Sequence, residues 1–169
     1  MLFLNYFELF KNLPPQLATF LLAMLPVAEL RVSIPFALAV YKLPLLSAYF
    51  YSVLGAFVPA IFILYLLDPV SKILMKHFKI FNKFFTWLFA HTRIRFGSKY
   101  TRYGLLALLI IAATPLPLAG VWTSALAAFL FQITKRTALL MIFLGTLLAG
   151  LIVTLASIGI FGTINFFKY

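Results

Sequence analysis

The stretch AMLPVAELRVSIPFALAV, residues 23–40, places Glu29 and Arg31 two positions apart within an otherwise apolar run. Residues two apart on a helix project about 200° from each other, so an unbroken helix would turn one charge toward lipid. That exposure costs at least about 2.5–3.5 kcal/mol near the bilayer centre. Pro26 and Pro35 bracket the pair, and each disfavours a continuous helix. The stretch therefore predicts a non-helical bend that points both charges into one polar cavity.

The composition of the whole chain is that of a membrane protein. Of its 169 residues, 64% are hydrophobic and only 10% are charged, whereas a soluble domain has roughly a quarter charged. The apolar runs at 43–67, 104–131 and 137–164 each reach the length of about 20 residues that a spanning helix needs. No alternation of apolar and polar residues indicates strands. We therefore expect a single all-α, polytopic membrane domain over residues 1–169.

A second broken segment is predicted at AATPLPLAGVWTSALAAF, residues 112–129. Pro115 and Pro117 lie two positions apart and Gly120 follows, so a continuous helix through 114–120 is not expected. Gly120 to Thr123 can begin a half-helix after this break. In the first segment, we expect Ser33 to cap a half-helix that holds Pro35 in its first turn.

The two broken segments belong to an internal repeat. At an offset of 90 residues, SVLGAFV around Gly55 aligns with IFLGTLL around Gly145, and both halves read as a broken segment followed by one full span, about 44–67 and 137–162. We therefore predict two repeats, about 15–67 and about 104–164. If each broken segment is a re-entrant hairpin, the halves insert with opposite orientation, as in transporters with inverted repeats and broken helices. An alternative is that the breaks only let helices pack closely. We assign the same packing role, and no other function, to Gly55, Gly145 and Gly150.

A basic segment, about 68–103, joins the repeats and holds eight of the fourteen Lys and Arg residues. The positive-inside rule predicts that it is cytoplasmic and that the chain lies in the cell's inner membrane. We expect the preceding helix to end at Asp68-Pro69 and an amphipathic interfacial helix to follow, roughly 70–90. Four lysines share one face of that helix and would contact anionic lipid: Lys72, Lys76, Lys79 and Lys83. A solvated linker helix is the alternative, and nucleic acid is disfavoured because the segment lies between membrane spans.

Charge alone does not decide between re-entrant and fully spanning broken segments, because both arrangements place equally many basic residues inside. The sequence also allows a homo-oligomer without requiring one. It has no cysteine, and His77 and His91 lack nearby companions for a zinc site. Phosphate-binding loops and nucleophile motifs are absent as well, so we expect no cofactor, no metal and no enzymatic activity.

At this point the motifs resemble a known family. LPVAELRVSIPFALA, residues 25–39, looks like the E-L-R-x-x-I-P signature of the small multidrug export family. PLPLAGVWTSALAAF, residues 115–129, is similar to that family's P-x-P-x-x-G-x-W-T-x-A-L motif, and LGTLLAGLIVTLASIG, residues 144–159, also fits. The resemblance covers about 15–160. Here Val32-Ser33 and Leu118-Ala119 replace the Gly-Ala and Gly-Thr that are usual in the family.

The family is distantly related to the DedA-type membrane proteins, some of which are polyprenyl-phosphate lipid translocases with paired re-entrant hairpins. The resemblance therefore implies facing hairpins and a site that combines an acid with an arginine. On this view the chain resembles a transporter, and a polyprenyl-phosphate or another phospholipid is a candidate substrate.

The residues themselves favour a transporter of an anionic or amphiphilic substrate. Glu29 is the only carboxylate within the apolar segments, so it is the candidate proton carrier. Arg31 would bind the anion, while Arg136 with Lys135 would gather a phosphate head group at the cytoplasmic mouth. We expect the second hairpin to line the site through Trp122 and Thr123.

Other functions are compatible with the same residues. Glu29 and Arg31 could form a structural ion pair that holds the bend. A membrane scaffold or assembly factor that does not transport, but binds lipid through the basic helix, is the main alternative function. A membrane enzyme ranks third, because no second acid–base group accompanies Glu29.

Overall fold

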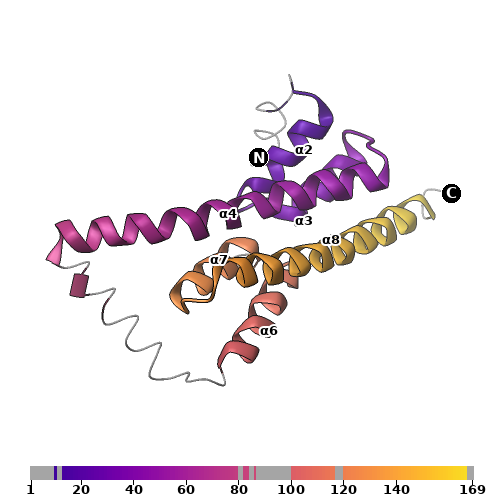
Figure 1. Ribbon diagram of the computed structural model, residues 1–169. Coiled ribbons are helices and arrows are strands. Elements are labelled where there is room, and N and C mark those ends of the chain that lie inside the picture. Colours follow the sequence, from indigo (N-terminus) through magenta and orange to yellow (C-terminus); the bar gives the residue numbers. More distant parts are fainter. Residues whose placement is uncertain are drawn as a thin grey trace. The chain divides into compact units, whose positions relative to one another are not determined.

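The computed structural model describes residues 10, 13–79, 82–83, 86, 100–116 and 120–166, and every regular element in these ranges is a helix (Figure 1). The helices are α2 (Pro15–Met24), α3 (Glu29–Ala39), α4 (Leu45–His77), α6 (Tyr100–Ala113), α7 (Val121–Leu130) and α8 (Lys135–Phe166). The prediction of an all-α fold is confirmed for this part of the chain.

Two of these helices have the length and composition of membrane spans. An 18-residue window of Leu45–His77 has a mean hydropathy of 2.2 and one of Lys135–Ile160 a mean hydropathy of 2.5, and both helices are long enough to cross a membrane. Roughly 20 apolar residues suffice for a crossing. The two predicted spans, about 44–67 and 137–162, lie within these helices, whereas α2 and α7 have only 10 residues each.

Side-chain size is distributed as expected for helices in lipid. More than half of the buried hydrophobic residues in the described ranges are alanines, and Ala23, Ala48 and Ala125 have no exposed surface. Large apolar side chains face outward, with Leu46 80% exposed and Ile110 61% exposed. In a soluble protein large apolar side chains are preferentially buried, whereas helices in membranes pack through small residues. In the described residues alanine therefore dominates the interior, and many large apolar side chains are exposed, as expected for a protein that lies in a membrane.

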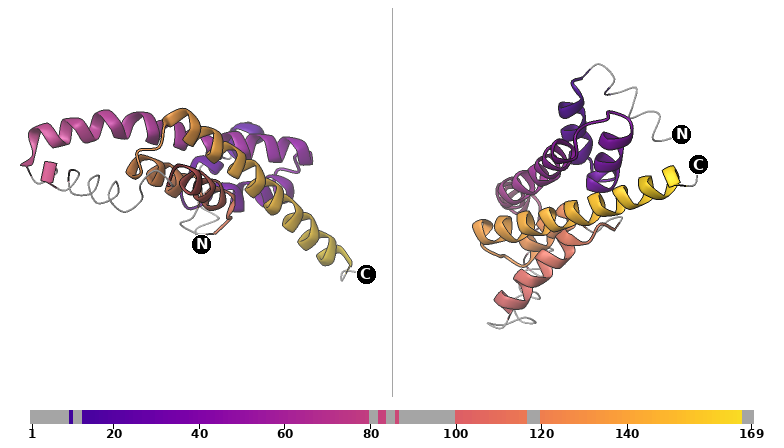
Figure 2. Two further views of the ribbon diagram at one scale, coloured as in Figure 1. Left: turned by 60° about the horizontal axis from the view of Figure 1, so that its bottom comes forward. Right: turned by 90° about the vertical axis from the view of Figure 1, so that its right-hand side faces the viewer.

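The chain divides into two compact units, each built from equivalent parts. The first unit, Met1–Val58 with Thr146–Tyr169, holds the α2–α3 hairpin, the start of α4 and the end of α8. The second unit, Pro59–Gly145, holds the α6–α7 hairpin, the start of α8 and the end of α4. Figure 2 shows both hairpins from two further directions.

In the first unit, α2 packs against α3 and also closely against α4. A Cβ added to Gly55 of α4 would overlap with the carbonyl oxygen of Phe20 and would lie 3.0 Å from the Cβ of Ala23. The hydroxyl of Tyr49 donates a hydrogen bond of 3.0 Å to the carbonyl of Leu147. Small size at Gly55 is therefore needed for two backbones to approach.

The second unit repeats this packing. Helix α6 packs against α7, and a Cβ added to Gly145 of α8 would lie 2.6 Å from the Cβ of Ala112 and 2.7 Å from the carbonyl oxygen of Leu109. Ser124 of α7 donates a hydrogen bond of 3.3 Å to the carbonyl of Leu108. The predicted packing role of Gly55 and Gly145 is confirmed.

Corresponding features of the two hairpins recur at the offset of 90 residues. Helix α4 begins at Leu45 and α8 at Lys135. The preceding connections each contain one non-glycine residue with the same positive φ, Lys42 and Gln132, both at 52°. Hydrogen bonds at the start of both helices also correspond. The amide of Ala48 donates to the carbonyl of Pro44, and the amide of Ala138 donates to the carbonyl of Thr134, each at 2.9 Å.

The prediction that a helix ends at Asp68-Pro69 is wrong, because α4 continues through both residues to His77. A proline removes one helical hydrogen bond, a loss that surrounding contacts can outweigh. Here the hydroxyl of Ser71 donates to the carbonyl of Asp68 at 2.9 Å, and the Asp68 carboxylate binds Lys135 at 2.7 Å.

The lysines of the predicted interfacial helix are therefore placed differently. Lys72 and Lys76 belong to the last turns of α4 rather than to a separate helix, and both are exposed. Lys79 and Lys83 are also exposed. Most of the predicted helix beyond residue 79 lies outside the described residues.

The predicted position of the first break also needs correction. The chain leaves the helical conformation at Leu25, directly before Pro26, and is helical again from Glu29. The amide of Glu29 already donates to the carbonyl of Leu25 at 3.0 Å. The break is therefore confined to residues 25–28, and it contains neither charge. Glu29 begins α3 with a φ of 45°, and Arg31 follows within the helix.

Ser33 and Pro35 consequently lie inside α3, and Ser33 does not cap a half-helix as predicted. The capping prediction took Pro35 to mark the first turn of a helix, where proline costs least. Instead, Pro26 alone interrupts the chain, and the helix has formed before Pro35 is reached. The loss of one hydrogen bond at Pro35 does not end it.

Candidate functional site

The first candidate site lies on the buried face of α3. Glu29 is only 9% exposed, and Ser33, one turn further along, has no exposed surface. Residues four apart share a helical face, and the other buried residues of α3 are Leu30, Ile34 and Ala37. The Ser33 hydroxyl has no hydrogen-bond partner within the described residues. This face therefore combines a buried acidic residue with a buried hydroxyl group that can still form a hydrogen bond to a ligand.

Two further polar groups of the first unit are buried in the same way. The Ser52 hydroxyl of α4 has no exposed surface, and within the described residues it has no hydrogen-bond partner. Nη2 of Arg31 donates a hydrogen bond of 3.0 Å to the carbonyl of Val27, which fixes the guanidinium against the break. Its Nε is buried and lacks a partner in the described part of the chain. Leaving buried polar groups unpaired is costly, and such groups often belong to binding sites.

The second candidate site lies at the break between α6 and α7. Helix α6 ends at Ala113 and α7 begins at Val121, so the described residues of this break confirm that no helix continues through it. Pro115 is the second residue after the end of α6, while Pro117 lies outside the described residues. Gly120 has a φ of 141°, a conformation that glycine adopts without strain.

Thr123 fastens the start of α7, a helix that begins where the sequence predicted a half-helix. Its hydroxyl accepts a hydrogen bond of 3.0 Å from the amide of Gly120 and donates one of 3.1 Å to the carbonyl of the same residue. Nε1 of Trp122 is buried and has no hydrogen-bond partner within the described residues. This hairpin therefore offers one free donor, while the Thr123 hydroxyl is already used to form the helix terminus.

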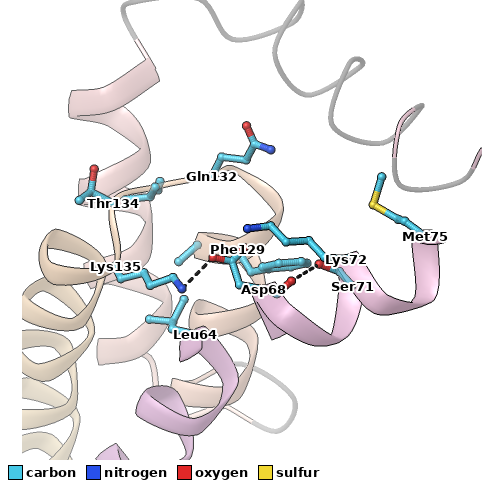
Figure 3. Close-up of a pocket in the computed structure, with 11 residues that line it drawn as sticks. Leu64, Asp68, Ser71, Lys72, Met75, Phe129, Gln132, Thr134 and Lys135 are labelled. Carbon is cyan, nitrogen blue, oxygen red and sulfur yellow. Dashed lines mark hydrogen bonds and ion pairs between the residues drawn. The ribbon is translucent and has the colours of Figure 1, made fainter. Parts of the chain in front are cut away.

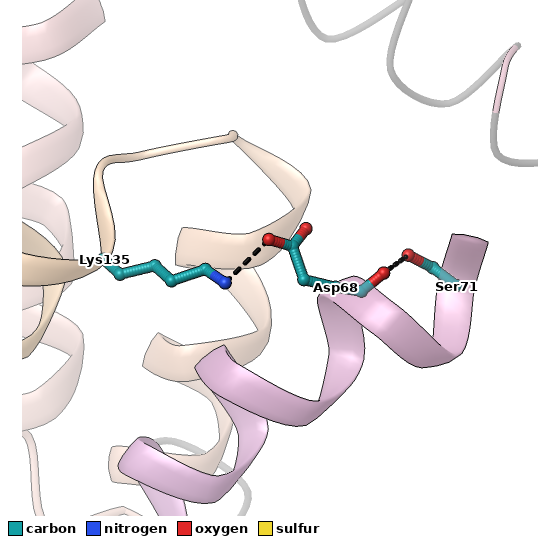
Figure 4. Close-up of polar contacts among 3 residues, drawn as sticks. All are labelled: Asp68, Ser71 and Lys135. Carbon is teal, nitrogen blue, oxygen red and sulfur yellow. Dashed lines mark hydrogen bonds and ion pairs between the residues drawn. The ribbon is translucent and has the colours of Figure 1, made fainter. Parts of the chain in front are cut away.

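A pocket in the second unit was not predicted (Figure 3). Its volume is about 430 Å³, and its walls come from α4, α7, the connection after α7 and the first residue of α8. Asp68 and Lys135 form an ion pair of 2.7 Å at its edge (Figure 4). Nζ of Lys135 also lies 5.2 Å from the centre of the Tyr65 ring. From the sequence, Lys135 was predicted to lie with Arg136 at the cytoplasmic mouth and to gather a phosphate head group, and Asp68 was predicted only to end a helix.

The predicted site residues thus fall into two groups. Glu29, Arg31, Ser33 and Pro35 share helix α3 of the first unit. Pro115, Gly120, Trp122 and Thr123 belong to the second hairpin, and Arg136 is an exposed residue of the first turn of α8. A common site formed by both hairpins stays a prediction. Among the described residues, no three His, Asp or Glu side chains group in a way that could hold a metal ion.

The two long apolar helices and the alanine-rich interior are those expected of a helical membrane protein. The family model described as "Putative small multi-drug export protein" matches residues 29–152, which is well over half of the chain. The chain belongs to this family, as its motifs predicted. No curated protein and no solved structure matches it.

Proposed function

We propose that this protein is an integral membrane transporter that moves an anionic or amphiphilic substrate and couples its movement to protons at Glu29. The observation that carries the proposal is the burial of Glu29 on an apolar hairpin, one turn from the Ser33 hydroxyl, which has no hydrogen-bond partner in the described part of the chain. Ionisable groups at membrane depth are costly and therefore usually functional. Arg31, which is always charged, would bind the anionic group of the substrate.

The proposed architecture is an inverted repeat of two re-entrant hairpins. Helices of 10 residues are roughly 15 Å long, about half the thickness of the hydrocarbon core, so α2 and α7 are too short to cross it. A hairpin that returns to its own side leaves one crossing in each half. The second half must then insert with the opposite orientation, and the central basic segment would lie in the cytoplasm.

Helix bending at two positions would suit such a transporter. The chain passes from the first unit to the second between Val58 and Pro59 of α4, and back again after Gly145 of α8. Pro59 removes one helical hydrogen bond, and prolines and glycines are the usual places where helices bend. These positions can absorb a change of shape at lower cost than the rest of the two long helices.

Orientation can be tested by single-cysteine labelling, because the chain has no native cysteine. Lys42→Cys and Arg136→Cys should react with an impermeant thiol reagent from opposite sides of the membrane, with residue 42 outside. Labelling of both from the same side would exclude the inverted repeat while leaving proton coupling untouched.

Proton coupling can be tested in proteoliposomes with an imposed pH gradient and a panel of amphiphilic drugs and polyprenyl-phosphate analogues. Glu29→Gln should insert and fold but lose transport that responds to pH, because the amide cannot release a proton. Glu29→Asp keeps a carboxyl group and should retain the response. Arg31→Lys keeps the charge but loses the planar fork, so it should weaken substrate binding.

A purely structural role of Glu29 gives a different pattern. Glu29→Gln would then lower the expression and melting temperature without any effect specific to transport. A well-expressed Glu29→Gln protein with full transport that still responds to pH would refute the proposed mechanism.

The alternative function, a scaffold that binds anionic lipid, draws on the exposure of Lys72, Lys76, Lys79 and Lys83. Changing all four to Gln should then release the basic segment from anionic bilayers, at roughly 1 kcal/mol per lysine, while Glu29→Gln has no effect. Loss of activity only in Glu29→Gln would exclude this function.

A further inference from the structure

The pocket of the second unit is lined by both apolar and polar residues. Leu64, Met75 and Phe129 are among the apolar ones, and Lys72 and Gln132 line it together with the ion pair (Figure 3). The volume of about 430 Å³ falls within the range of roughly 300–1,000 Å³ that is usual for small-molecule sites. Such a pocket suits a molecule with an apolar part and a polar head.

The charges of the pocket favour an anionic head. Three ionisable residues line it, one carboxylate and two lysines, so its net charge is positive. Asp68 is held by Lys135, whereas Lys72 has no ion-pair partner within the described residues. Figure 3 shows Lys72 reaching from α4 toward the same part of the pocket as the ion pair.

The ion pair itself can be exchanged. The side chains of Lys135 and Asp68 are 36% and 40% exposed, and ion pairs with that much access to water are weak. An anion that approaches Lys72 can therefore replace the Asp68 carboxylate on Lys135. Thr134 and Gln132, whose side chains carry hydrogen-bond donors, also line the pocket.

We propose that this pocket binds a phosphate group carried by an amphiphile. The phosphate lies between Lys72 and Lys135, and the apolar chain lies against Leu64 and Phe129. The inference goes beyond the proposed function, because it concerns only residues of the second unit and holds whether or not Glu29 couples transport to protons.

The proposal can be tested by binding to the full-length protein in a neutral detergent at about 0.15 M salt, where long-range attraction between exposed charges is screened. The probes are lysophosphatidic acid, a lysophosphatidylcholine with the same acyl chain, and inorganic phosphate. Lysophosphatidic acid should bind tightest, because it alone offers both a phosphate monoester and an apolar chain. Equal affinity for inorganic phosphate would show that the apolar chain does not contribute to binding. Equal affinity for the lysophosphatidylcholine would show that the lysines do not recognise the charge of the head group. Either result would overturn the proposal.

Four variants test the proposal, because it predicts for each of them whether lysophosphatidic acid binds more weakly, more tightly or with unchanged affinity. Lys72→Gln and Lys135→Gln should each weaken binding of lysophosphatidic acid by about three- to fivefold, the range for a partly exposed charge. Asp68→Asn should strengthen binding by a similar factor, because it frees Lys135 from its competitor. Lys42→Gln removes an exposed lysine that does not line the pocket and has no proposed role in lipid binding, so it should have no effect.

The opposite outcomes overturn the proposal. If Lys42→Gln weakens binding as much as Lys72→Gln, the lipid binds to diffuse surface charge. Weaker binding in Asp68→Asn would mean that the carboxylate contacts a cationic ligand. Neither result depends on transport, so both are distinguishable from failure of the proposed function.

Discussion

Close approach of α2 and α4 at Gly55 leads to a quantitative prediction for Gly55→Ala. The added methyl group would overlap with the carbonyl oxygen of Phe20, a backbone atom that cannot rotate away as a side chain can. Overpacking typically costs about 1–3 kcal/mol, and a rigid neighbour places this variant at the upper end. Alanine regains up to about 1 kcal/mol as the better helix former. We expect a net loss of about 2 kcal/mol.

Two other glycines provide matched comparisons. Gly145→Ala would place its methyl group 2.6 Å from the Cβ of Ala112 and 2.7 Å from a backbone oxygen, so it should be destabilised less than Gly55→Ala. Gly159 of α8 has nothing within 4 Å of an added Cβ. Gly159→Ala should therefore gain up to about 1 kcal/mol from helix propensity alone.

Thermal unfolding in detergent, followed by fluorescence-detected gel filtration, measures all three variants. For a chain of this length each kcal/mol shifts the melting temperature by roughly 2–4 °C. Gly55→Ala should then melt about 4–8 °C lower than the unchanged protein, and Gly159→Ala should melt slightly higher. If Gly55→Ala is as stable as Gly159→Ala, the close contact between α2 and α4 does not exist and the reasoning fails.

Three further predictions concern the polar groups and the prolines. Thr123→Val removes both hydrogen bonds to Gly120 and should cost about 0.5–2 kcal/mol, measured as a lower melting temperature; an unchanged value would contradict the cap. Ser52→Ala should leave stability unchanged or slightly raised, because its hydroxyl has no partner within the described residues; a loss above about 1 kcal/mol would reveal a partner such as bound water. Pro59→Ala restores a helical amide to α4, so it should raise the melting temperature and slow transport, and normal transport would count against bending at this position.

The sequence was sufficient to predict the features that depend on composition and length. Apolar runs located both long helices, and the repeated glycines located the closest helix contacts. The break before α7 was found because Pro115 and Gly120 both oppose a helix within a few residues. Each of these features follows from local chemistry, so no knowledge of the tertiary structure was needed.

Prolines show where local reasoning is insufficient. Pro26 and Pro115 lie in breaks, whereas Pro35, Pro59 and Pro69 lie inside helices. Each removes the same single hydrogen bond, so whether the helix continues depends on contacts made by the surrounding turns. For Pro69, one such contact is the ion pair between Asp68 and a residue far along the chain.

The candidate site was predictable in its residues but not in its geometry. Glu29 stood out because carboxylates are rare in apolar segments, and it is indeed buried. The sequence could not predict that α3 begins at this residue or that the Arg31 guanidinium binds the carbonyl of Val27. The pocket lined by Asp68, Lys72 and Lys135 was missed because its charges come from segments widely separated in sequence.

The alanine-rich interior has a consequence for how this family can vary. Where interior positions already hold the smallest side chains, substitution there can hardly create a cavity, and it can only add volume that the neighbouring helices must accommodate. On the outer surface, lipid chains fill any space left by a shortened Leu or Phe. Inside the protein, a substitution should therefore be tolerated only if the new side chain is not larger than the old one. On the outer surface, it should be tolerated if the new side chain is apolar. In the core of a soluble protein, by contrast, it is the shortening of large side chains that is most destabilising.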